Sequence, residues 1–463
     1  MCLILQRDDV MKDFDEVLSS YKDEFLKDLN ELLSIKSVSA EGTDGPREAL
    51  IWMLAKAEQF GLKTKNYEDI AGHAEYGEGE KICGVLTHLD VVPAERKDWS
   101  CEPFALTIKD GRLYGRGVAD DKGAALAALY CLRALKECDV HGNRVRVIFG
   151  TSEEIGMRDM ETYFSYEPIP DMSFTPDSEY GICKAEKGIL HLEVTSPVAN
   201  NTTLTQFESG KANNVVPDVA YALVDCNEYE DHKLQRLADS REGNFEISYT
   251  IDGVKITSIG KAAHACEPEK GFNAAAALVG LLSSVFGHYC LGDLCSFIDS
   301  SIGMETNGRS MGIKMRDSAS GPLTVTLSRV SIVENNVSAV LDIRYPVTVK
   351  GEVVLYQVTK VAQQENLSVK VIDQEKPLSL DESSDIVGIL KKAYENVTGE
   401  EPVLYTTGGG TYARTLGGRG VAFGPVFPND ESRMHNTDES LNEENFFRHF
   451  RICLEAMYGM MTY

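Results

Sequence analysis

The sequence predicts an α/β fold, with one domain built on a central mixed β-sheet flanked by helices and a second, inserted α+β domain. The chain has 463 residues, which is more than one ordinary core accommodates. Short apolar runs alternate with helical patterns as far as residue 186, whereas the runs beyond it resemble a more exposed sheet. We therefore expect residues 1–186 and 381–463 to form the first domain and residues 187–380 the inserted one.

The first domain is expected to begin with helices over 11–35 and 45–62, where apolar residues recur at helical spacing. A hairpin is predicted around Asp110-Gly111 and a helix over 121–138. Apolar runs that end in polar side chains predict three strands. These are KICGVLTHLDVV (81–92), NRVRVIFGTSEE (143–154) and MSFTPDSE (172–179).

The inserted domain is predicted to contain several strands and two helices. The strands are GILHLEVTSP (188–197), FEISYTIDG (245–253), VKITSIGKAA (254–263), NNVSAVLDIRYPV (335–347) and LSVKVIDQ (367–374). The helices cover 271–289 and about 350–365. After residue 381 we expect a helix over 384–397, a glycine-rich loop and a terminal helix.

The composition excludes several classes of partner. The net charge is −26 and no basic run occurs, so the surface repels phosphate backbones and we expect no nucleic-acid partner. No stretch approaches the ~18 apolar residues that span a bilayer, so we expect no membrane partner. The eleven cysteines contain no CxxC pair, which favours reduced thiols in a cytoplasmic protein.

Acidic and histidine side chains follow the predicted strands where each one ends. In open α/β sheets, sites form at the carboxyl ends of strands, so we expect these side chains on one rim of the first sheet. They are His88, Asp90, Asp120, Glu153, Glu154 and Asp177.

Each of these residues also has a structural explanation. His88 and Asp90 share one side of a strand end, so Asp90 can accept a hydrogen bond from one imidazole nitrogen and leave the other for a metal; the HxD pattern is nevertheless common. Asp120 and Asp121 lie at a turn that opens a helix, where aspartate is a favoured N-cap, although a carboxylate there can also bridge two cations.

Adjacent glutamates usually form a solvated turn, but Glu153 and Glu154 follow an apolar strand and face different directions. One can then coordinate a metal while the other remains a base. A late histidine, His435, lies in FGPVFPNDESRMHNTDE near the carboxyl terminus.

The motifs occur in a characteristic order, namely THLDVVP (87–93), DWSCEPFALTIKDGRLYGRGVADDKG (98–123), TSEEIG (151–156), SFTPDSE (173–179) and MHNTDE (434–439). This order and spacing resemble the two-metal metallopeptidase family of aminoacylases, carboxypeptidase G and carnosinases over essentially the whole chain. The resemblance implies that the first domain is catalytic and that the inserted domain is a lid.

The resemblance also implies the metal ligands. One metal takes His88, Asp120 and Asp177, and the other takes the same bridging Asp120 with Glu154 and His435. Asp90 is the residue that orients His88, Glu153 is the general base, and the peptide after Asp120 is cis. Two cations can hold and acidify one bridging water, from which Glu153 takes the proton for the departing nitrogen.

Further matches point to substrate-binding residues in the later part of the chain. GKAAHACEPEKGFNAA (260–275) implies that His264 stabilises the oxyanion from across the cleft; otherwise it is a surface histidine. NNVVP and DIRYP imply that Asn214 and Arg344 bind substrate, with Asn213 as the competitor for the first position. TTGGGTYAR (406–414) lacks the GK[ST] of a phosphate loop, and exposed amides there can instead hold a small carboxylate. The resemblance implies that this loop lies over the carboxyl-terminal end of the substrate, with Gly409 and Gly410 as the expected binding residues.

The chain looks most similar to the bacterial dipeptidases of the PepV and Sapep type. We therefore expect a monomeric dipeptidase with a short peptide as its substrate. Its cofactors would be two divalent cations, most suitably zinc, with manganese or cobalt as alternatives. Two other functions stay open: an N-acyl-amino-acid deacylase with the same metals and base, and a non-catalytic metal-binding homologue.

Overall fold

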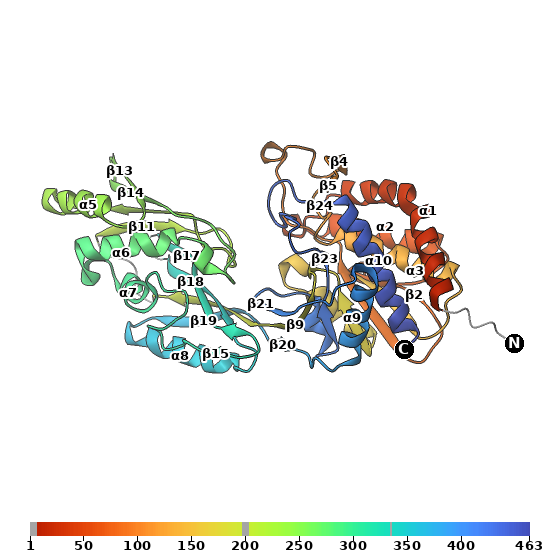
Figure 1. Cartoon of the computed structure of the whole chain (residues 1–463). Coiled ribbons are helices and arrows are strands. Elements are labelled where there is room, and N and C mark those ends of the chain that lie inside the picture. The colour runs from red at the N-terminus through yellow and green to blue at the C-terminus, as the bar shows by residue number, and fades with distance from the viewer. Residues whose placement is uncertain (1–6, 197–202, 334–335) are drawn as a thin grey trace. The chain divides into compact units, whose positions relative to one another are not determined.

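The computed structural model describes residues 7–196, 203–333 and 336–463, and these form two compact units (Figure 1). Unit 1 comprises the described parts of Met1–Lys184, Ser379–Tyr405 and Thr411–Tyr463. Unit 2 comprises those of Ala185–Leu378 and Thr406–Gly410. Unit 1 has a mixed sheet with helices and unit 2 is an inserted α+β unit, so the predicted fold class is confirmed.

The main sheet of unit 1 has its central strands in parallel. Its order is β1 (Lys63–Tyr67), β2 (Ala71–Tyr76), β6 (Arg144–Gly150), β3 (Ile82–His88), β7 (Met172–Thr175), β22 (Gly420–Ala422), β9 (Ile182–Glu186) and β20 (Leu378–Ser379), with β21 (Leu404–Thr407) paired to β9. Strand β3 pairs in parallel with both β6 and β7, and β22 pairs in parallel with β7. The carboxyl ends of these strands therefore share one edge of the sheet.

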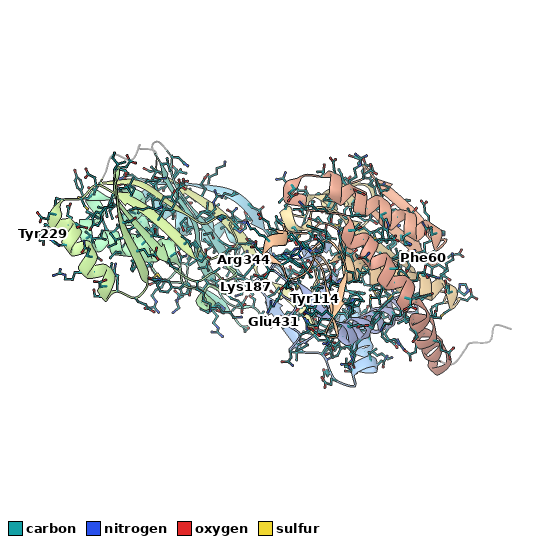
Figure 2. All side chains as sticks on the ribbon, turned by 90° about the horizontal axis from the view of Figure 1, so that it is seen from above. Phe60, Tyr114, Lys187, Tyr229, Arg344 and Glu431 are labelled. Atoms are coloured by element: carbon teal, nitrogen blue, oxygen red, sulfur yellow. The ribbon has the colours of Figure 1, made fainter. Side chains whose placement is uncertain are left out.

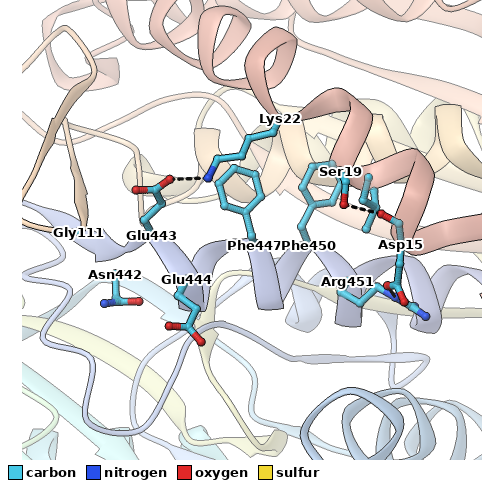
Figure 3. A pocket seen from close by; sticks show the side chains of 11 residues that line it. Asp15, Ser19, Lys22, Gly111, Asn442, Glu443, Glu444, Phe447, Phe450 and Arg451 are labelled. Carbon is cyan, nitrogen blue, oxygen red and sulfur yellow. Dashed lines mark hydrogen bonds and ion pairs between the residues drawn. The ribbon is translucent and has the colours of Figure 1, made fainter. Parts of the chain in front are cut away.

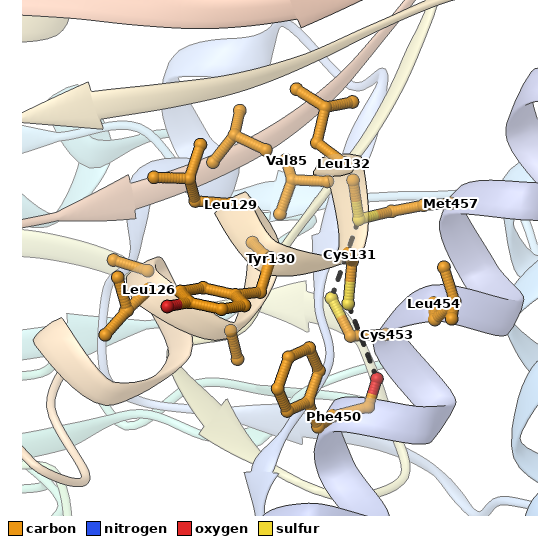
Figure 4. Packing of buried hydrophobic residues seen from close by; sticks show 14 of the residues in the cluster. Val85, Leu126, Leu129, Tyr130, Cys131, Leu132, Phe450, Cys453, Leu454 and Met457 are labelled. Atoms are coloured by element: carbon orange, nitrogen blue, oxygen red, sulfur yellow. Dashed lines mark hydrogen bonds between the residues drawn. The ribbon is translucent and has the colours of Figure 1, made fainter. Parts of the chain in front are cut away.

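The helices of unit 1 pack around a largely aliphatic and aromatic core. They are α1 (Arg7–Ser34), α2 (Asp44–Gln59), α3 (Lys122–Glu137), α4 (Arg158–Tyr166), α9 (Asp385–Thr398) and α10 (Glu443–Met461). Helix α3 is rich in alanine and leucine, which favour helix, and nearly all of its side chains are buried. It contacts α1, α10 and the sheet, and Leu129, Tyr130 and Leu454 belong to this core (Figure 4).

A hollow of about 710 Å³ lies between α1 and α10 (Figure 3). Leu18, Phe447 and Phe450 give it an apolar lining, and Lys22 pairs with Glu443 beside it at 2.8 Å. None of the candidate site residues lines this hollow. Within the described residues, no helix combines the length and the apolar character needed to cross a membrane.

Unit 2 contains an antiparallel sheet of eight strands that buries one face. The order is β13 (Asn244–Thr250), β14 (Gly253–Ile259), β12 (Val219–Val224), β11 (Leu204–Ser209), β17 (Thr324–Val333), β18 (Asn336–Tyr345), β10 (Gly188–Thr195) and β19 (Ser368–Glu375). Burial alternates along β14, where Val254 and Ile256 face the core, as expected for a period of two. The predicted strand ends at residues 197 and 335 lie outside the described residues.

In the described part of unit 2 this sheet is accompanied by the helices α5 (Glu228–Ser240), α6 (Ala274–Phe286), α7 (Asp293–Phe297) and α8 (Gly351–Gln364). Helix α5 was not predicted from the sequence, because its apolar pattern is weak and Leu234 is its one fully buried side chain. The sequence signal that could have predicted α5 is at its amino terminus, where Asn227 and Glu230 form a reciprocal capping box.

The glycine-rich segment Thr406–Gly410 clusters with unit 2, although it lies in the range expected for the first domain. Three hydrogen bonds explain this placement. The Lys187 amide donates to Thr407 O at 3.0 Å, Thr406 Oγ1 donates to Ala319 O at 2.9 Å, and Arg344 Nη1 donates to Gly408 O at 2.9 Å.

An ion cluster braces the edge of the unit 1 sheet. Arg146 on β6 donates to Glu75 on β2 at 2.5 Å and to Glu167 at 2.6 Å, and all three residues are more than nine-tenths buried. Lys65 and Tyr67 also donate to Glu167. Burial acts to raise the pKa of Glu167, but these donors outweigh it and lower the pKa to about 2.

We expect Glu167→Gln to lower the free energy of unfolding at pH 7 by about 3 kcal/mol, because it removes one carboxylate from a buried ion cluster. A lowered folded-state pKa stabilises the protein above pH 4.5, and this stabilisation is lost as the pH falls towards 2. Urea unfolding should show that the difference in the free energy of unfolding between the variant and the unsubstituted protein is smaller at pH 3 than at pH 7. Glu161→Gln, at an exposed site on α4, is the control; an equal gap at both pH values would contradict the charge-based explanation.

Candidate metal centre

His88 is the last residue of β3 and is fully buried. Its Nδ1 lies 2.9 Å from the main-chain oxygen of Asp90 and 3.4 Å from Asp90 Oδ1, so the nearer partner is the carbonyl rather than the carboxylate. An Nδ1–H that donates to this carbonyl leaves the lone pair on Nε2. His88 Nε2 lies 2.8 Å from Asp120 Oδ1 and 3.8 Å from Asp177 Oδ2.

The turn before α3 carries Asp120 and Asp121, which are joined by a cis peptide as the resemblance implies. Asp121 occupies the N-cap position but makes no side-chain capping bond, so the capping explanation does not account for it. Asp121 Oδ2 instead accepts from the His88 amide at 3.2 Å. This bond ties the Asp120 turn to the end of β3.

Glu153 and Glu154 begin the short 3₁₀ turn Glu153–Ile155 after β6. Their amides donate to the two carboxylate oxygens of Asp90, at 3.1 Å and 3.2 Å. The buried Asp90 therefore orients the turn that carries both glutamates, while its main-chain oxygen orients His88.

His435 completes the cluster from a loop that follows β23 (Pro425–Val426). Its Nε2 lies 2.9 Å from Asp120 Oδ2 and 3.2 Å from Glu154 Oε1. Two groups of ligand atoms result, each gathered within 4.8 Å: His88 with Asp120 and Asp177, and Asp120 with Glu154 and His435. Asp120 belongs to both groups, and residues from five distant segments of unit 1 meet at this point.

Burial and neighbouring charges shift the pKa values of the carboxylates at this centre, and the two imidazoles lower that of Asp120 although burial acts to raise it. Burial and the Asp120 charge raise the pKa of Glu154 to about 7, and burial with the Asp177 charge raises that of Glu153 well above its ordinary value. Burial disfavours the charged imidazoles, but neighbouring carboxylates raise the pKa values of both His88 and His435. The two ligand groups together thus hold three carboxyl groups and only two imidazoles.

The donor set fits a pair of divalent cations. It combines imidazole nitrogens with carboxylate oxygens, which zinc, manganese and cobalt all accept. Glu154 Oε1 is buried, and the nearby group is His435 Nε2 at 3.2 Å, a spacing that suits two ligand atoms of one cation. Two dications would also offset the crowded carboxylate charge.

Comparison with known proteins identifies the family. The model of "Peptidase family M20/M25/M40" matches residues 84–458, which include every residue of the two groups. The chain belongs to peptidase family M20/M25/M40. The predicted resemblance and the prediction of a metallopeptidase are thereby confirmed.

Relatives of this peptidase cover nearly its whole length. "Putative dipeptidase YtjP" of Bacillus subtilis is 33% identical over 456 residues, covering 95% of this chain and 97% of the relative. A "Putative dipeptidase" of Staphylococcus epidermidis is 32% identical over 464 residues, covering 96% and 98%.

Solved structures share the fold at lower identity. Human carnosine dipeptidase 1 has a TM-score of 0.63 at 16% identity and covers 98% of each chain. The dipeptidase Dug1p of Saccharomyces cerevisiae has a TM-score of 0.62 at 16% identity, covering 97% and 98%.

The remaining predicted residues of the peptidase lie in unit 2. His264 follows β14, and its Nδ1 lies 2.8 Å from Cys266 Sγ. Asn214 accepts the Ala265 amide through its main-chain oxygen at 2.8 Å, while the competitor Asn213 accepts Arg329 Nη1 at 3.5 Å.

Arg344 on β18 (labelled in Figure 2) pairs with Asp342 through two contacts of 2.6 Å and also holds Gly408 O. The Gly409 amide donates to Thr407 Oγ1 at 3.0 Å. Gly410 adjoins this loop within the same unit. The roles of these residues in substrate binding stay predictions.

Three residues that support the metal centre were not predicted. Glu439 accepts three backbone amides near Asp120. Asp159 on α4 accepts the amides of Thr151 and Ser152 at 2.5 Å and 2.8 Å, and the Tyr412 hydroxyl donates to the same carboxylate. The sequence signal that could have predicted Glu439 is its position in MHNTDE, four residues after His435. No comparable signal predicts the contacts of Asp159 and Tyr412.

We expect divalent cations to displace protons when they bind the metal-free peptidase at pH 7. Glu154, with a pKa of about 7, and the two histidines, with raised pKa values, must lose protons before they coordinate. Affinity should therefore rise with pH, by about tenfold per pH unit for each proton displaced. Calorimetry in two buffers of different ionisation enthalpy measures this release, and a binding heat independent of the buffer would contradict it.

Proposed function

We propose that this peptidase is a dipeptidase that requires two divalent cations and cleaves short peptides with a free amino terminus and a free carboxylate. The observation that carries the proposal is the pair of ligand groups that share Asp120 beside Glu153. The names of the curated relatives, which cover almost the whole chain, also support a dipeptidase. We expect the enzyme to act as a monomer in the cytoplasm.

His88, Asp120 and Asp177 would hold one cation, and Asp120, Glu154 and His435 the other. Zinc suits this set best, with manganese or cobalt as alternatives. When bound, the two cations supply Lewis acidity that lowers the pKa of water to ~7 and stabilises developing negative charge.

Glu153 acts as the general base in this proposal. It takes a proton from the attacking water and delivers it to the departing amine nitrogen, so that the carboxylate is regenerated. Its raised pKa suits a group that must both accept and release a proton near neutral pH. Asp90 holds the Glu153 amide and so fixes the position of the turn.

Unit 2 would supply the groups that recognise the substrate. Arg344 and the loop with Gly409 and Gly410 would bind the free carboxylate through the guanidinium charge and backbone amides, with the carboxylate replacing the contacts to Gly408 O and Thr407 Oγ1. Their proximity within unit 2, through Arg344 Nη1 and Gly408 O, supports this assignment. His264 would stabilise the oxyanion and Asn214 would bind the substrate backbone.

We expect Glu153→Gln to lower kcat by about 10²–10⁴-fold, because general-base catalysis contributes that much. The metal content should stay at the level of the unsubstituted enzyme, since Glu153 belongs to neither ligand group. Turnover of a dipeptide and elemental analysis of the same preparation test both points, with Glu161→Gln as the matched control. Undiminished turnover would show that another group is the base.

A substrate panel separates the dipeptidase from the N-acyl-amino-acid deacylase. We expect hydrolysis of free dipeptides, and at least tenfold lower kcat/KM for the N-acetylated amino acids and for carboxyl-amidated dipeptides. Preference for the N-acetyl amino acids would replace the dipeptidase proposal with the deacylase. Binding of cations without turnover of any member would instead indicate a non-catalytic homologue.

A further inference from the structure

Glu439 joins the two loops that carry Asp120 and His435. Its side chain is fully buried, and Oε1 accepts the amides of Gly117, Ala119 and Asp120 at 3.1, 2.9 and 3.2 Å. A carboxylate that accepts three backbone amides fixes the path of that backbone. Glu439 thus holds the main chain at Asp120, although it is not itself in either ligand group.

Arg116 contacts both the Glu439 carboxylate and the segment that carries His435. Its Nη1 donates to Glu439 Oε2 at 2.5 Å, and its Nη2 donates to the main-chain oxygen of Asn436, the neighbour of His435, at 3.2 Å. The guanidinium also lies over the Trp99 ring, 5.1 Å from its centre. Both members of the pair are buried, so their attraction is little screened by solvent.

Besides Arg116 and Glu439, the segment with His435 is also held by Asp438, whose Oδ1 accepts the amide and the hydroxyl of Ser100 at 2.8 and 2.9 Å. His435 and Asp438 have φ values of 62° and 57°, in the left-handed region that is unfavourable for residues with a Cβ atom. Residues 435–437 are exposed, and 44% of the His435 side chain is accessible. The contacts of Arg116 with Asn436 and of Glu439 with Arg116 therefore help to fix the position of the imidazole.

The other ligand group is held differently. His88 ends the buried strand β3, and Asp177 follows the buried strand β7, which pairs with β3. Neither residue contacts Arg116 or Glu439 among the interactions of the described residues. Loss of the pair should therefore disturb the group with His435 more than the group with His88 and Asp177.

We propose that Arg116 and Glu439 are a positioning pair that sets the affinity of the cation held by Asp120, Glu154 and His435, with a smaller effect on the other cation, whose ligand group shares only Asp120 with the first. This inference rests on the proposed metal ligands, but it does not depend on which peptide is cleaved. The pair acts through the backbone and touches neither cation.

The test is titration of the metal-free full-length protein with Zn²⁺ by calorimetry, for the unsubstituted chain and for Glu439→Gln. We expect two binding steps in the unsubstituted chain. In the variant we expect one step to lose about 10–100-fold in affinity, the range for residues that orient metal ligands, and the other step to lose less. Activity of the variant should recover when Zn²⁺ is raised, with KM unchanged, which a general loss of structure would not produce. Glu431→Gln, an exposed site on the same segment (Figure 2), should behave as the unsubstituted chain.

Circular dichroism of each variant establishes that it is folded. If Glu439→Gln does not fold, the same Zn²⁺ titration is made with Glu439→Asp, and the same change in the two affinities is expected. This variant keeps the charge opposite Arg116, but its shorter side chain no longer reaches the amides. Unchanged affinity in both steps, or an equal loss in both, would overturn the positioning role. A single binding step in the unsubstituted chain would instead overturn the two-cation proposal, so the two failures are distinguishable.

Discussion

The metal centre depends on one constraint, the gathering of several carboxylates and two imidazoles at the shared edge of parallel strands. Strands β6, β3 and β7 lie side by side and point the same way, so the segments after them meet. Glu153, His88 and Asp177 come from these three strand ends. Burial, together with repulsion from neighbouring acids, raises the pKa values of Glu153, Glu154 and Asp177, whereas the two imidazoles lower that of Asp120. Cations are the species that best offset such a concentration of acids.

A second group of carboxylates holds the loops of the metal centre in place and belongs to neither ligand group. Asp90 accepts the amides of Glu153 and Glu154, and Asp159 accepts the amides of residues 151 and 152. Glu439 accepts the amides around Asp120. Each uses charge-assisted hydrogen bonds to hold a loop that has little apolar surface of its own. The loops are therefore fixed by buried polar contacts and the strands by the hydrophobic core.

The elements with strong periodic patterns were predictable from sequence. Helices α3 and α6 and strands β3 and β6 fall where their apolar runs predict them. Helix α5 was missed because tertiary packing buries only Leu234. The segment Thr406–Gly410 clusters with unit 2 because of hydrogen bonds to Lys187, Ala319 and Arg344, all distant in sequence.

The sequence alone determined the class of fold, the family and the set of polar residues that converge, because hydrophobic period and motif order are local properties of the chain. Only the tertiary structure decided which atoms hold that set in place. It showed that the nearest partner of His88 Nδ1 is the Asp90 carbonyl, that Asp121 does not cap α3, and that Arg116 and Glu439 brace the loop of His435. Arg116 and Glu439 lie 323 positions apart, so no local pattern encodes their contact, and the choice between the carbonyl and the carboxylate of Asp90 depends on the folded path of the strand end.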